Sequence, residues 1–271
     1  MYAVDGKYGN KAFSDFGLVI CKVDSSAGTE VLDMGSELTY NLVKAPNSNR
    51  WNLYGTQYSN YLTITFQVAK VNPLKTKLQP MGTDEYSSFM RWINRKNVSE
   101  QFKPIQNGYN NIYFTGSFNA KPIELCGEFY GAELTFTSDS PFGYLDIPQF
   151  SFTTTQNNQQ IVINDQSDEI GFLYPDTMTI KCNASGNLTI HNSIENLDMV
   201  INNVTSGEII TLDGQNQIIS SSTSHNNTIY DDFNAEFFRV ANTYESRINT
   251  LTISLPCEIT FKYSPIRKVG V

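Results

Sequence analysis

The chain holds two histidines, and neither has a partner at a spacing that would build a catalytic or metal site. His191 ends a segment of alternating apolar and polar residues, and His225 lies in the polar run SSSTSHNNT. Histidine is the commonest general acid or base and a frequent metal ligand, but a metal needs two such ligands on one face, as HExxH or HxH provides. We therefore expect no metal site.

Motifs for covalent catalysis and for nucleotide binding are also missing. The sequence contains no GxSxG, no GxxxxGK[ST] and no GxGxxG. The acidic pairs Asp168–Glu169 and Asp231–Asp232 have the groups that glycoside hydrolysis needs, but a sequence does not report how far apart two carboxylates lie, and acids in loops are usually solvated. We expect no catalytic residue and no cofactor, which favours a structural or binding protein.

The four cysteines stand alone in the sequence, at Cys21, Cys126, Cys182 and Cys257. No CxxC spacing joins any two of them, so a metal or redox motif is not indicated. The N-terminal segment lacks the basic start, apolar core and cleavage site of a secretion signal. We therefore expect thiols in a reducing cytoplasm, packed as small core residues.

The residue types that anchor protein interfaces gather in one segment, Lys44–Asn60, which is predicted to connect two strands. A connector of this length is unusual inside a compact domain and is often functional. Arginine, tryptophan and tyrosine dominate the binding energy of interfaces. We expect this segment to reach a neighbouring subunit or an adjacent protein through Arg50, Trp51, Tyr54 and Tyr58. In the alternative, Trp51 and Tyr54 fold back onto their own domain.

The elements that would carry this segment are mostly strands. Apolar and polar residues alternate with period two, which is typical of strands with one buried face. Turn-like stretches separate most of them, so we expect antiparallel pairing. The predicted strands of the first half are Gly17–Val23, Leu38–Leu42, Tyr61–Val71, Ile112–Phe118 and Tyr130–Phe136.

One helix is expected in this half, over Asp84–Asn97. Its apolar residues recur at i, i+3, i+4 and i+7, the spacing of one helix face. Thr83 can cap the start, and the basic residues Arg91, Arg95 and Lys96 suit the negative end of the helix dipole. The face consists of Tyr86, Phe89, Met90 and Ile93, widened by Trp92.

A domain boundary is predicted near Gln149. The tract TTTQNNQQ at Thr153–Gln160 is polar and has no periodicity, as expected of a connector. Beyond it, short strands recur at spacings of about 8–12 residues, which is typical of a β-sandwich without helices. We therefore expect a domain of residues 1–148 and a β-sandwich of residues 149–271. The predicted strands are 177–182, 187–191, 199–202, 208–212, 217–220, 248–255 and 258–263.

Composition excludes several classes of protein. The 271 residues are 40% hydrophobic and 17% charged, enough apolar material for packed cores and unlike a disordered chain. The net charge of −8 and the absence of a basic run argue against phosphate-directed nucleic-acid binding. Uncharged apolar stretches such as Gly17–Ile20 are far shorter than the roughly 20 residues of a membrane span, so no membrane insertion is expected.

Several segments resemble one known family, the distal tail proteins of long, non-contractile-tailed bacteriophages and prophages of Gram-positive bacteria. The likeness extends over nearly the whole chain. Its clearest marker is the strand-like ELTFTSDSPFGY, with an acidic residue, a proline and aromatics at its end. The segments that carry it are FSDFGLVI (13–20), FMRWIN (89–94), ELTFTSDSPFGY (133–144), GNLTIHN (186–192), GEIITLDG (207–214) and INTLTISLPCEITFKYSP (248–265).

This resemblance implies a mainly β protein that acts as a hub of the virion tail tip, assembled in the host cytoplasm. An N-terminal antiparallel β domain with one helix would close into a homo-hexameric ring, and a galectin-like β-sandwich would follow it. Such hubs join the tail tube protein to the tail-associated fibre or lysin protein and often hold receptor-binding proteins. An acidic lumen would let DNA pass without specific binding.

The sequence departs from longer relatives in its second half. Beyond Gln149 it has no room for an inserted carbohydrate-binding module, so it is similar to the short form of the family, and direct host binding is less expected. A glycan-binding β-sandwich adhesin remains the alternative, although both tryptophans, Trp51 and Trp92, lie in the first half. The aromatic residues available for it are Tyr174, Tyr230, Phe233, Phe237, Phe238 and Tyr244.

Overall fold

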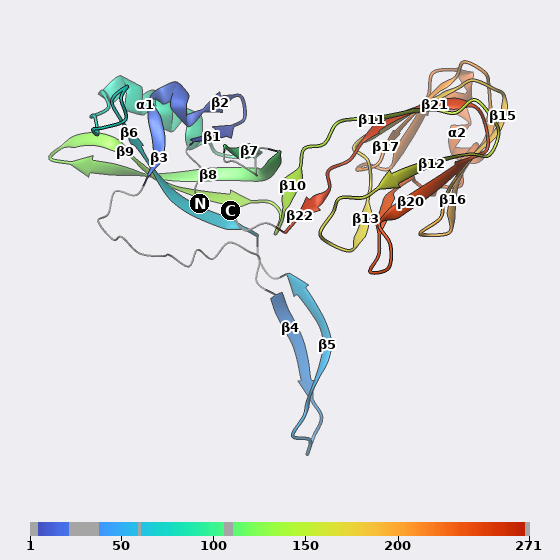
Figure 1. The fold of residues 1–271 in the computed structure, drawn as a ribbon, viewed down its shortest axis with the longest axis horizontal. Coiled ribbons are helices and arrows are strands. Elements are labelled where there is room, and N and C mark those ends of the chain that lie inside the picture. Colours follow the sequence, from blue (N-terminus) through green and yellow to red (C-terminus); the bar gives the residue numbers. More distant parts are fainter. Residues whose placement is uncertain (1–4, 22–37, 59–60, 106–110, 269–271) are drawn as a thin grey trace. The chain divides into compact units, whose positions relative to one another are not determined.

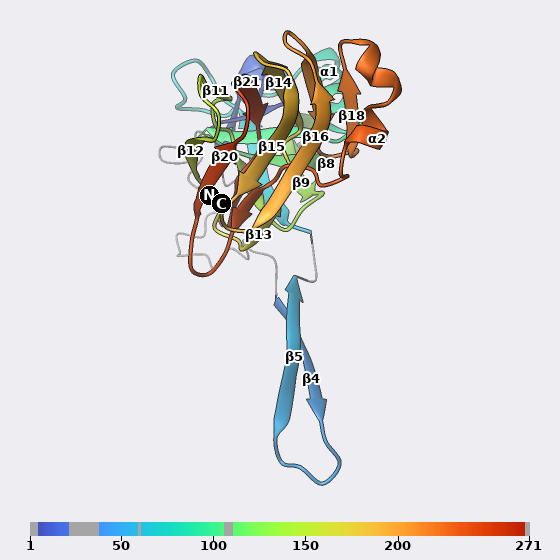
Figure 2. The same ribbon diagram turned by 90° about the vertical axis from the view of Figure 1, so that its right-hand side faces the viewer.

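The computed structural model describes residues 5–21, 38–58, 61–105 and 111–268. These residues form two compact units. The first ends at Tyr144 and also contains Arg267 and Lys268, and the second is Leu145–Ile266. Both consist mainly of antiparallel strands (Figures 1 and 2).

A nine-stranded sheet forms the body of the first unit. Its main path is β2-β1-β7-β8-β9-β6-β3, and β10 adds to β8 and also pairs with β22. Neighbours along this path are antiparallel. The strands are β1 (Asp5–Tyr8), β2 (Lys11–Ala12), β3 (Leu18–Cys21), β6 (Thr63–Lys70), β7 (Glu100–Ile105), β8 (Ile112–Leu125), β9 (Glu128–Ser138), β10 (Gly143–Leu145) and β22 (Ile266–Arg267); a 3-10 turn, η1 (Phe13–Phe16), follows β2.

Alternation places one face of this sheet in a core, as the sequence predicted. In β6, Ile64, Phe66 and Val68 are buried while Thr63 and Thr65 face solvent. The predicted strands at 61–71, 112–118 and 130–136 are thereby confirmed as β6, β8 and β9. Residues 22 and 23 of the predicted strand 17–23 lie outside the described residues, and the rest contains β3.

The core of the first unit is a cluster of aromatic rings, and Phe118 lies at its centre. Its ring is 4.9 Å from Phe136, 5.0 Å from Tyr8 and 5.1 Å from Phe102, measured between centroids. Phe66 follows at 5.9 Å. Tyr8, Phe102 and Phe66 meet the Phe118 ring edge-to-face, and such arrangements add to the stabilisation from burial.

Helix α1 (Thr83–Ile93) confirms the predicted helix, although its ends were predicted incorrectly. It starts one residue earlier, with Gly82 as N-cap and no side-chain capping bond, so Thr83 is not the cap. It stops at Ile93 because Asn94 leaves the helical region at φ −100° and ψ 78°. Arg95 therefore lies beyond the last turn of the helix, and its Nη2 forms an ion pair with Glu100 Oε1 at 2.8 Å.

The apolar face of α1 is buried as expected. Phe89, Trp92 and Ile93 are in the core. Tyr86 is half-buried and stacks on Phe129 of β9, with ring centroids 4.2 Å apart. The aromatic stripe is thus packing surface that fixes the helix on the sheet.

The second unit is a β-sandwich. One sheet has the order β11-β21-β14-β17-β18 and the other β12-β20-β15-β16, with β13 and β19 as a separate pair. The strands are β11 (Phe150–Thr153), β12 (Gln159–Asn164), β13 (Gly171–Leu173), β14 (Thr177–Cys182), β15 (Gly186–Asn192), β16 (Leu197–Val204), β17 (Ile209–Asp213), β18 (Ile218–Ser221), β19 (Val240–Asn242), β20 (Ile248–Ile253) and β21 (Cys257–Lys262).

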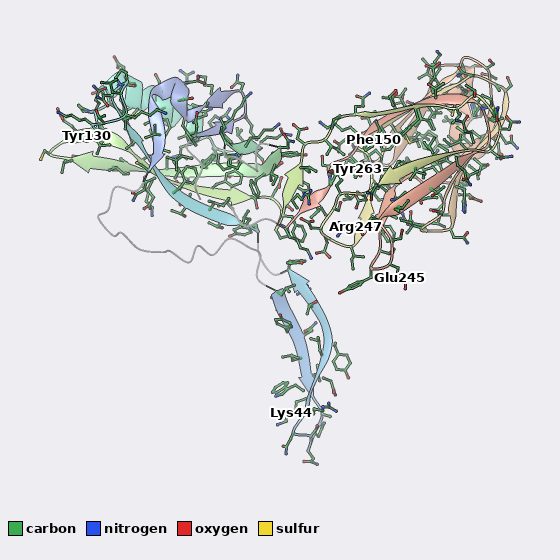
Figure 3. All side chains as sticks on the ribbon, viewed as in Figure 1. Lys44, Tyr130, Phe150, Glu245, Arg247 and Tyr263 are labelled. Carbon is green, nitrogen blue, oxygen red and sulfur yellow. The ribbon has the colours of Figure 1, made fainter. Side chains whose placement is uncertain are left out.

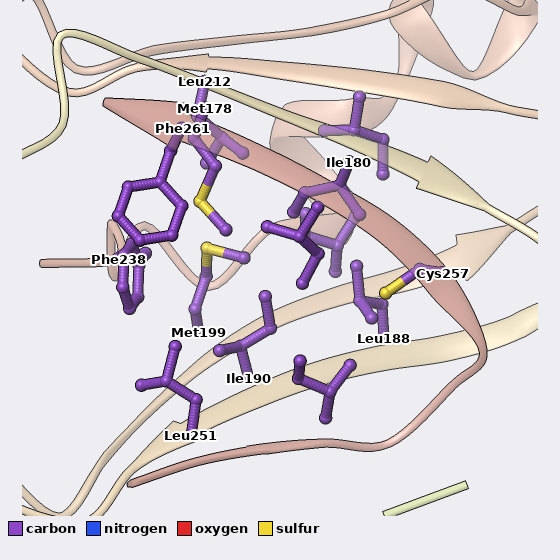
Figure 4. Close-up of a cluster of buried hydrophobic side chains, with 14 of the residues drawn as sticks. Met178, Ile180, Leu188, Ile190, Met199, Leu212, Phe238, Leu251, Cys257 and Phe261 are labelled. Carbon is purple, nitrogen blue, oxygen red and sulfur yellow. The ribbon is translucent and has the colours of Figure 1, made fainter. Parts of the chain in front are cut away.

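Apolar side chains from both sheets meet in the core of this sandwich (Figure 4). Met178 and Ile180 of β14 lie on one side, and Leu188, Ile190 and Leu251 lie on the other. The strands predicted for this half are confirmed as β14–β18, β20 and β21. This agreement arises because both sheets alternate buried and exposed residues along each strand.

Two expectations for the second half were wrong. The tract Thr153–Gln160 was treated as a connector, but β11 ends at Thr153 and β12 begins at Gln159, so only residues 154–158 connect two strands. Phe150 and Phe152 of β11 pack against the core. The unit also contains a 3-10 turn, η2 (Ser224–Asn227), and a short helix, α2 (Ile229–Asp232), although no helix was predicted. Four-residue helices are too short for apolar periodicity to reveal them.

Candidate interaction surface

The segment predicted to form an interface is one half of a β-hairpin. Strands β4 (Leu38–Lys44) and β5 (Trp51–Tyr58) pair antiparallel, and no other described strand joins them. Figures 1 and 2 show this β4–β5 hairpin as a separate two-stranded ribbon. Within Lys44–Asn60, Lys44 ends β4, residues 45–50 form the turn and Trp51–Tyr58 is β5, while residues 59 and 60 lie outside the described residues. The interpretation of the segment as a connector was therefore wrong.

The pairing register separates the hairpin into an apolar and a polar face. Leu42 lies opposite Leu53, and Lys44 lies opposite Trp51. Tyr40 and Leu38 follow on the same face of β4, because every second residue of a strand faces the same way. The other face carries Thr39, Asn41, Val43, Asn52, Gly55 and Gln57.

No part of the described chain covers the apolar face. The side chains of Tyr40, Leu42, Trp51 and Leu53 are 55%, 48%, 60% and 57% exposed. The alternation of Leu38, Tyr40 and Leu42 predicted a strand with one buried face, and this was wrong for the described residues, because all of β4 is exposed. Alternation shows that one face is apolar, but it does not show whether the chain itself covers that face.

The four residues singled out from the sequence lie along β5 and the turn before it. Arg50 is exposed in the turn, where its backbone N–H donates to Ser48 Oγ at 3.0 Å. Trp51 starts β5, and Tyr54, 73% exposed, is the unpaired residue of a β-bulge. Neither ring folds back onto the domain, so that alternative does not hold in this structure.

Tyr58 differs from the other three because the first unit holds its ring. The ring meets Phe142 edge-on, with centroids 4.7 Å apart, and the Lys268 ammonium lies 5.6 Å from its centroid. Tyr58 thus fixes the base of the hairpin. Sequence reasoning missed Leu38, Tyr40 and Leu42, which alternate like an ordinary strand, and Leu53, which lies in the segment treated as a connector.

The hairpin differs in charge from the rest of the protein. It contains Lys44 and Arg50 and no acidic residue, while the whole chain has a net charge of −8. The remaining residues therefore carry ten net negative charges. Lys44 lies near the end of the hairpin (Figure 3), with its ammonium 6.0 Å from the Trp51 ring centroid. The apolar face is thus bordered by positive charge.

The second unit contains a cluster of titratable side chains around His225. Its Nδ1 lies 2.7 Å from Glu208 Oε1, and its Nε2 lies 3.3 Å from Asp232 Oδ2 without hydrogen-bond geometry. Ser221 Oγ donates to Glu208 Oε1 at 2.6 Å, and the Thr205 N–H donates to Oε2 at 2.7 Å. The Ser221 hydroxyl donates its hydrogen bond to the Glu208 carboxylate and not to the His225 imidazole. The cluster is therefore not arranged as a serine nucleophile with a histidine base.

Glu208 is a fully buried carboxylate held by donors. Burial alone would raise the pKa of Glu208, but hydrogen bonds from Ser221, Thr205 and His225 outweigh it and lower that pKa below its ordinary value. A carboxylate whose pKa is lower in the folded state contributes stability above its unfolded pKa and loses it as the pH falls. The cluster therefore stabilises the sandwich at neutral pH.

We expect Glu208→Gln to lower the free energy of unfolding at pH 7 by about 2 kcal/mol, because buried donors lose their charged acceptor. The difference from the wild type should shrink as the pH falls below 4.5, where the unfolded carboxyl takes up its proton. Urea unfolding at several pH values measures this. Glu245→Gln, at an exposed position, is the matched control, and an equal pH dependence in both variants would contradict the assignment.

The other residues considered for chemistry make local contacts. His191 Nδ1 lies 2.7 Å from Asp198 Oδ1 near the surface. Arg239 Nε donates to Glu195 Oε1 at 2.6 Å, and its Nη1 donates to Tyr174 Oη at 2.9 Å. The hydroxyl of Tyr174, one of the aromatic residues considered for glycan binding, thus already accepts a hydrogen bond within the protein. In the described ranges, no group of three or more His, Cys, Asp or Glu side chains is arranged to hold a metal ion.

The remaining aromatic residues considered for glycan stacking do not form one exposed platform. Phe233 and Phe238 are buried in the core. Phe237 packs edge-on against Phe233, with centroids 5.0 Å apart. Tyr230, on α2, and Tyr244, after β19, are the exposed rings. This distribution gives no support to the adhesin alternative.

The described helices are all too short or too polar to cross a bilayer.

Two family models match the chain. The family described as the phage tail protein N-terminal domain matches residues 1–140, and the family described as the phage tail C-terminal domain matches residues 142–263. No curated protein matches the sequence.

A solved structure shares the fold along almost the whole chain. It is the crystal structure of the Dit protein of phage SPP1, described as a paradigm of the hub adsorption apparatus in phages that infect Gram-positive bacteria. The TM-score is 0.64 at 9% identity, over 97% of this chain and 98% of that one. The expected fold class, a β-rich domain with one main helix followed by a galectin-like sandwich, is confirmed. The chain belongs to the phage tail protein family that these N-terminal and C-terminal domains define, and its fold is that of a distal tail protein.

Proposed function

We propose that this phage tail protein is a non-enzymatic hub of the tail tip, which closes into a hexameric ring. The ring would join the tail tube protein to the tail-associated fibre or lysin protein. The domain of residues 1–148 would form the ring, and the sandwich of residues 149–271 would be the site where receptor-binding proteins attach. Family membership and the distal-tail fold support the hub role.

The observation that best supports the proposed ring is the uncovered apolar face of the β4–β5 hairpin. An isolated two-stranded hairpin is at best marginally stable in water. Contiguous exposed apolar surface on a folded protein commonly marks a protein interface. Tyr40, Leu42, Trp51 and Leu53 form such a surface. We infer that another protein covers it in the assembled tail.

A second copy of the chain is the partner that fits this surface best. The hairpin carries two positive charges and no acid, and the rest of the chain carries ten net negative charges. Opposite charges on two parts of one sequence favour head-to-tail contact between copies. Such a contact joins two different surface patches, and it generates a closed ring when the rotation between copies closes.

The acidic balance of the chain also suits a conduit for DNA. Carboxylates on the wall of a lumen repel phosphates, so DNA would pass without being held by ion pairs. We propose that the protein is assembled into the tail tip in the host cytoplasm and stays there as a virion component.

The mass of the purified chain in solution tests the ring. We expect a particle with six times the mass of one chain, or a pair of such rings, by mass photometry or sedimentation at micromolar concentration. A monomer that binds sugars on a glycan array would contradict the proposal and favour the adhesin alternative.

A further inference from the structure

Two buried cysteines face each other across neighbouring strands of the sandwich. Cys182 ends β14 and Cys257 begins β21, and the two residues are directly paired in the register. Both side chains are fully buried free thiols. Residues directly opposite each other in an antiparallel pair project to the same side of the sheet. The two thiols therefore enter the core side by side, where Figure 4 shows Cys257 among apolar side chains.

Backbone hydrogen bonds identify the type of this pair. The Cys182 N–H donates to the Glu208 carbonyl at 2.8 Å, away from β21. The Cys257 N–H donates to Thr154 Oγ1 at 2.8 Å, and its carbonyl accepts from the Thr154 N–H at 2.8 Å, away from β14. Because the N–H and C=O of a strand residue point to the same side, the cysteines exchange no ladder bond. They are a non-hydrogen-bonded pair.

This geometry matches that of a cross-strand disulfide. Non-hydrogen-bonded pairs have Cα atoms about 4.5 Å apart and bring the side chains closer than hydrogen-bonded pairs do. Disulfides span Cα separations of about 4.4–6.8 Å. A bond between the two sulfurs therefore needs no change in strand register and breaks no ladder hydrogen bond.

We propose that Cys182 and Cys257 are a latent disulfide site, which a low-molecular-weight disulfide such as oxidised glutathione converts into a cross-strand bond between β14 and β21. One cysteine thiolate attacks the oxidant and displaces one glutathione thiolate, forming a mixed disulfide. The second cysteine thiolate then displaces the other glutathione. Two cysteine thiols are oxidised, one glutathione disulfide is reduced to two thiols, and these take up the two protons released.

The folded state keeps the pair reduced until the sandwich opens. Burial, with the neighbouring Cys257 and Glu208, raises the pKa of Cys182 to about 12, and burial also raises the pKa of Cys257. Only the thiolate attacks a disulfide, so both residues react slowly while they are buried. Disulfides form and persist on virion surfaces, which are oxidising, and not in the cytosol. The bond would thus form in chains that fold or open outside the cytosol.

Refolding in a glutathione redox buffer tests the site in the full chain. We expect free thiols to fall from four to two per chain, and a peptide linking Cys182 to Cys257 in an unreduced digest. The bond closes a long loop, so the unfolding midpoint of the oxidised protein should exceed that of the same sample after reduction by roughly 10 °C.

Two variants separate this site from general oxidation. The double variant Cys21→Ala with Cys126→Ala should still form the linked peptide and show the higher midpoint. Cys182→Ala should show neither. Four remaining thiols after refolding, links made mainly through Cys21 or Cys126, or an unchanged midpoint in the linked wild type would each overturn the proposal.

Discussion

Replacing Tyr40 with serine and Trp51 with alanine together is expected to abolish ring assembly while leaving the protein folded. Both side chains lie on the apolar face of the β4–β5 hairpin and are more than half exposed in the single chain. Anchor residues at the centre of an interface typically contribute about 2 kcal/mol or more each. Losing about 4 kcal/mol weakens each contact roughly a thousandfold. Particle mass at a fixed protein concentration measures this loss.

A matched control lies on the opposite face of the same two strands. Thr39 and Gln57 are paired with each other there, and both are exposed. Changing both to alanine should leave the ring intact, and the unfolding midpoint should be unchanged in all variants. A ring that survives the Tyr40 and Trp51 changes, or that is lost equally in the control, would show that the apolar face does not hold the copies together.

Phe118→Ala is expected to lower the free energy of unfolding of the first unit by about 4 kcal/mol. The ring is 4% exposed and lies about 5 Å from three other aromatic rings. Phenylalanine to alanine changes in a core remove buried apolar surface and leave a cavity, with typical costs of 3–5 kcal/mol. Denaturant unfolding, followed by the fluorescence of the nearby core residue Trp92, measures the loss.

Phe118→Leu keeps most of the apolar volume and should cost only about 1 kcal/mol. Equal losses in the two variants would indicate that cavity formation does not determine the effect. A loss below 1 kcal/mol for Phe118→Ala would contradict the central position of this ring in the core.

Much of the fold could be predicted because burial imposes a period on the sequence. In β6 and in α1 the apolar positions repeat every two or every three to four residues, and the structure buries those positions. The helix ends could not be predicted this way. Arg95 looked like a residue of the last turn, but its guanidinium pairs with Glu100 beyond the helix, a contact that local pattern does not contain.

The hairpin shows where periodicity stops being informative. Leu38, Tyr40 and Leu42 alternate like the residues of β6, but those of β6 lie in the core and those of β4 are exposed. Alternation records that selection keeps one face apolar, and the surface that covers it can belong to another molecule. The basic, acid-free composition of residues 38–58 was the available signal in the sequence.

Contacts between distant segments were the least predictable. Cys182 and Cys257 stand alone in the sequence and become neighbours only through the pairing of β14 with β21. Glu208 and His225 likewise meet because β18 and η2 return the chain to the start of β17. No spacing rule relates residues joined by such long returns, so tertiary structure was needed to find both clusters.

Electron cryomicroscopy of the tail tip in intact particles tests the central claim most directly. We predict a sixfold ring of this chain in which a neighbouring copy covers Tyr40 and Trp51, with acidic side chains of that copy near Lys44 and Arg50. The claim would be contradicted by an assembly in which the side chains of Tyr40 and Trp51 face solvent. It would also be contradicted if the hairpin contacted only proteins of other sequence.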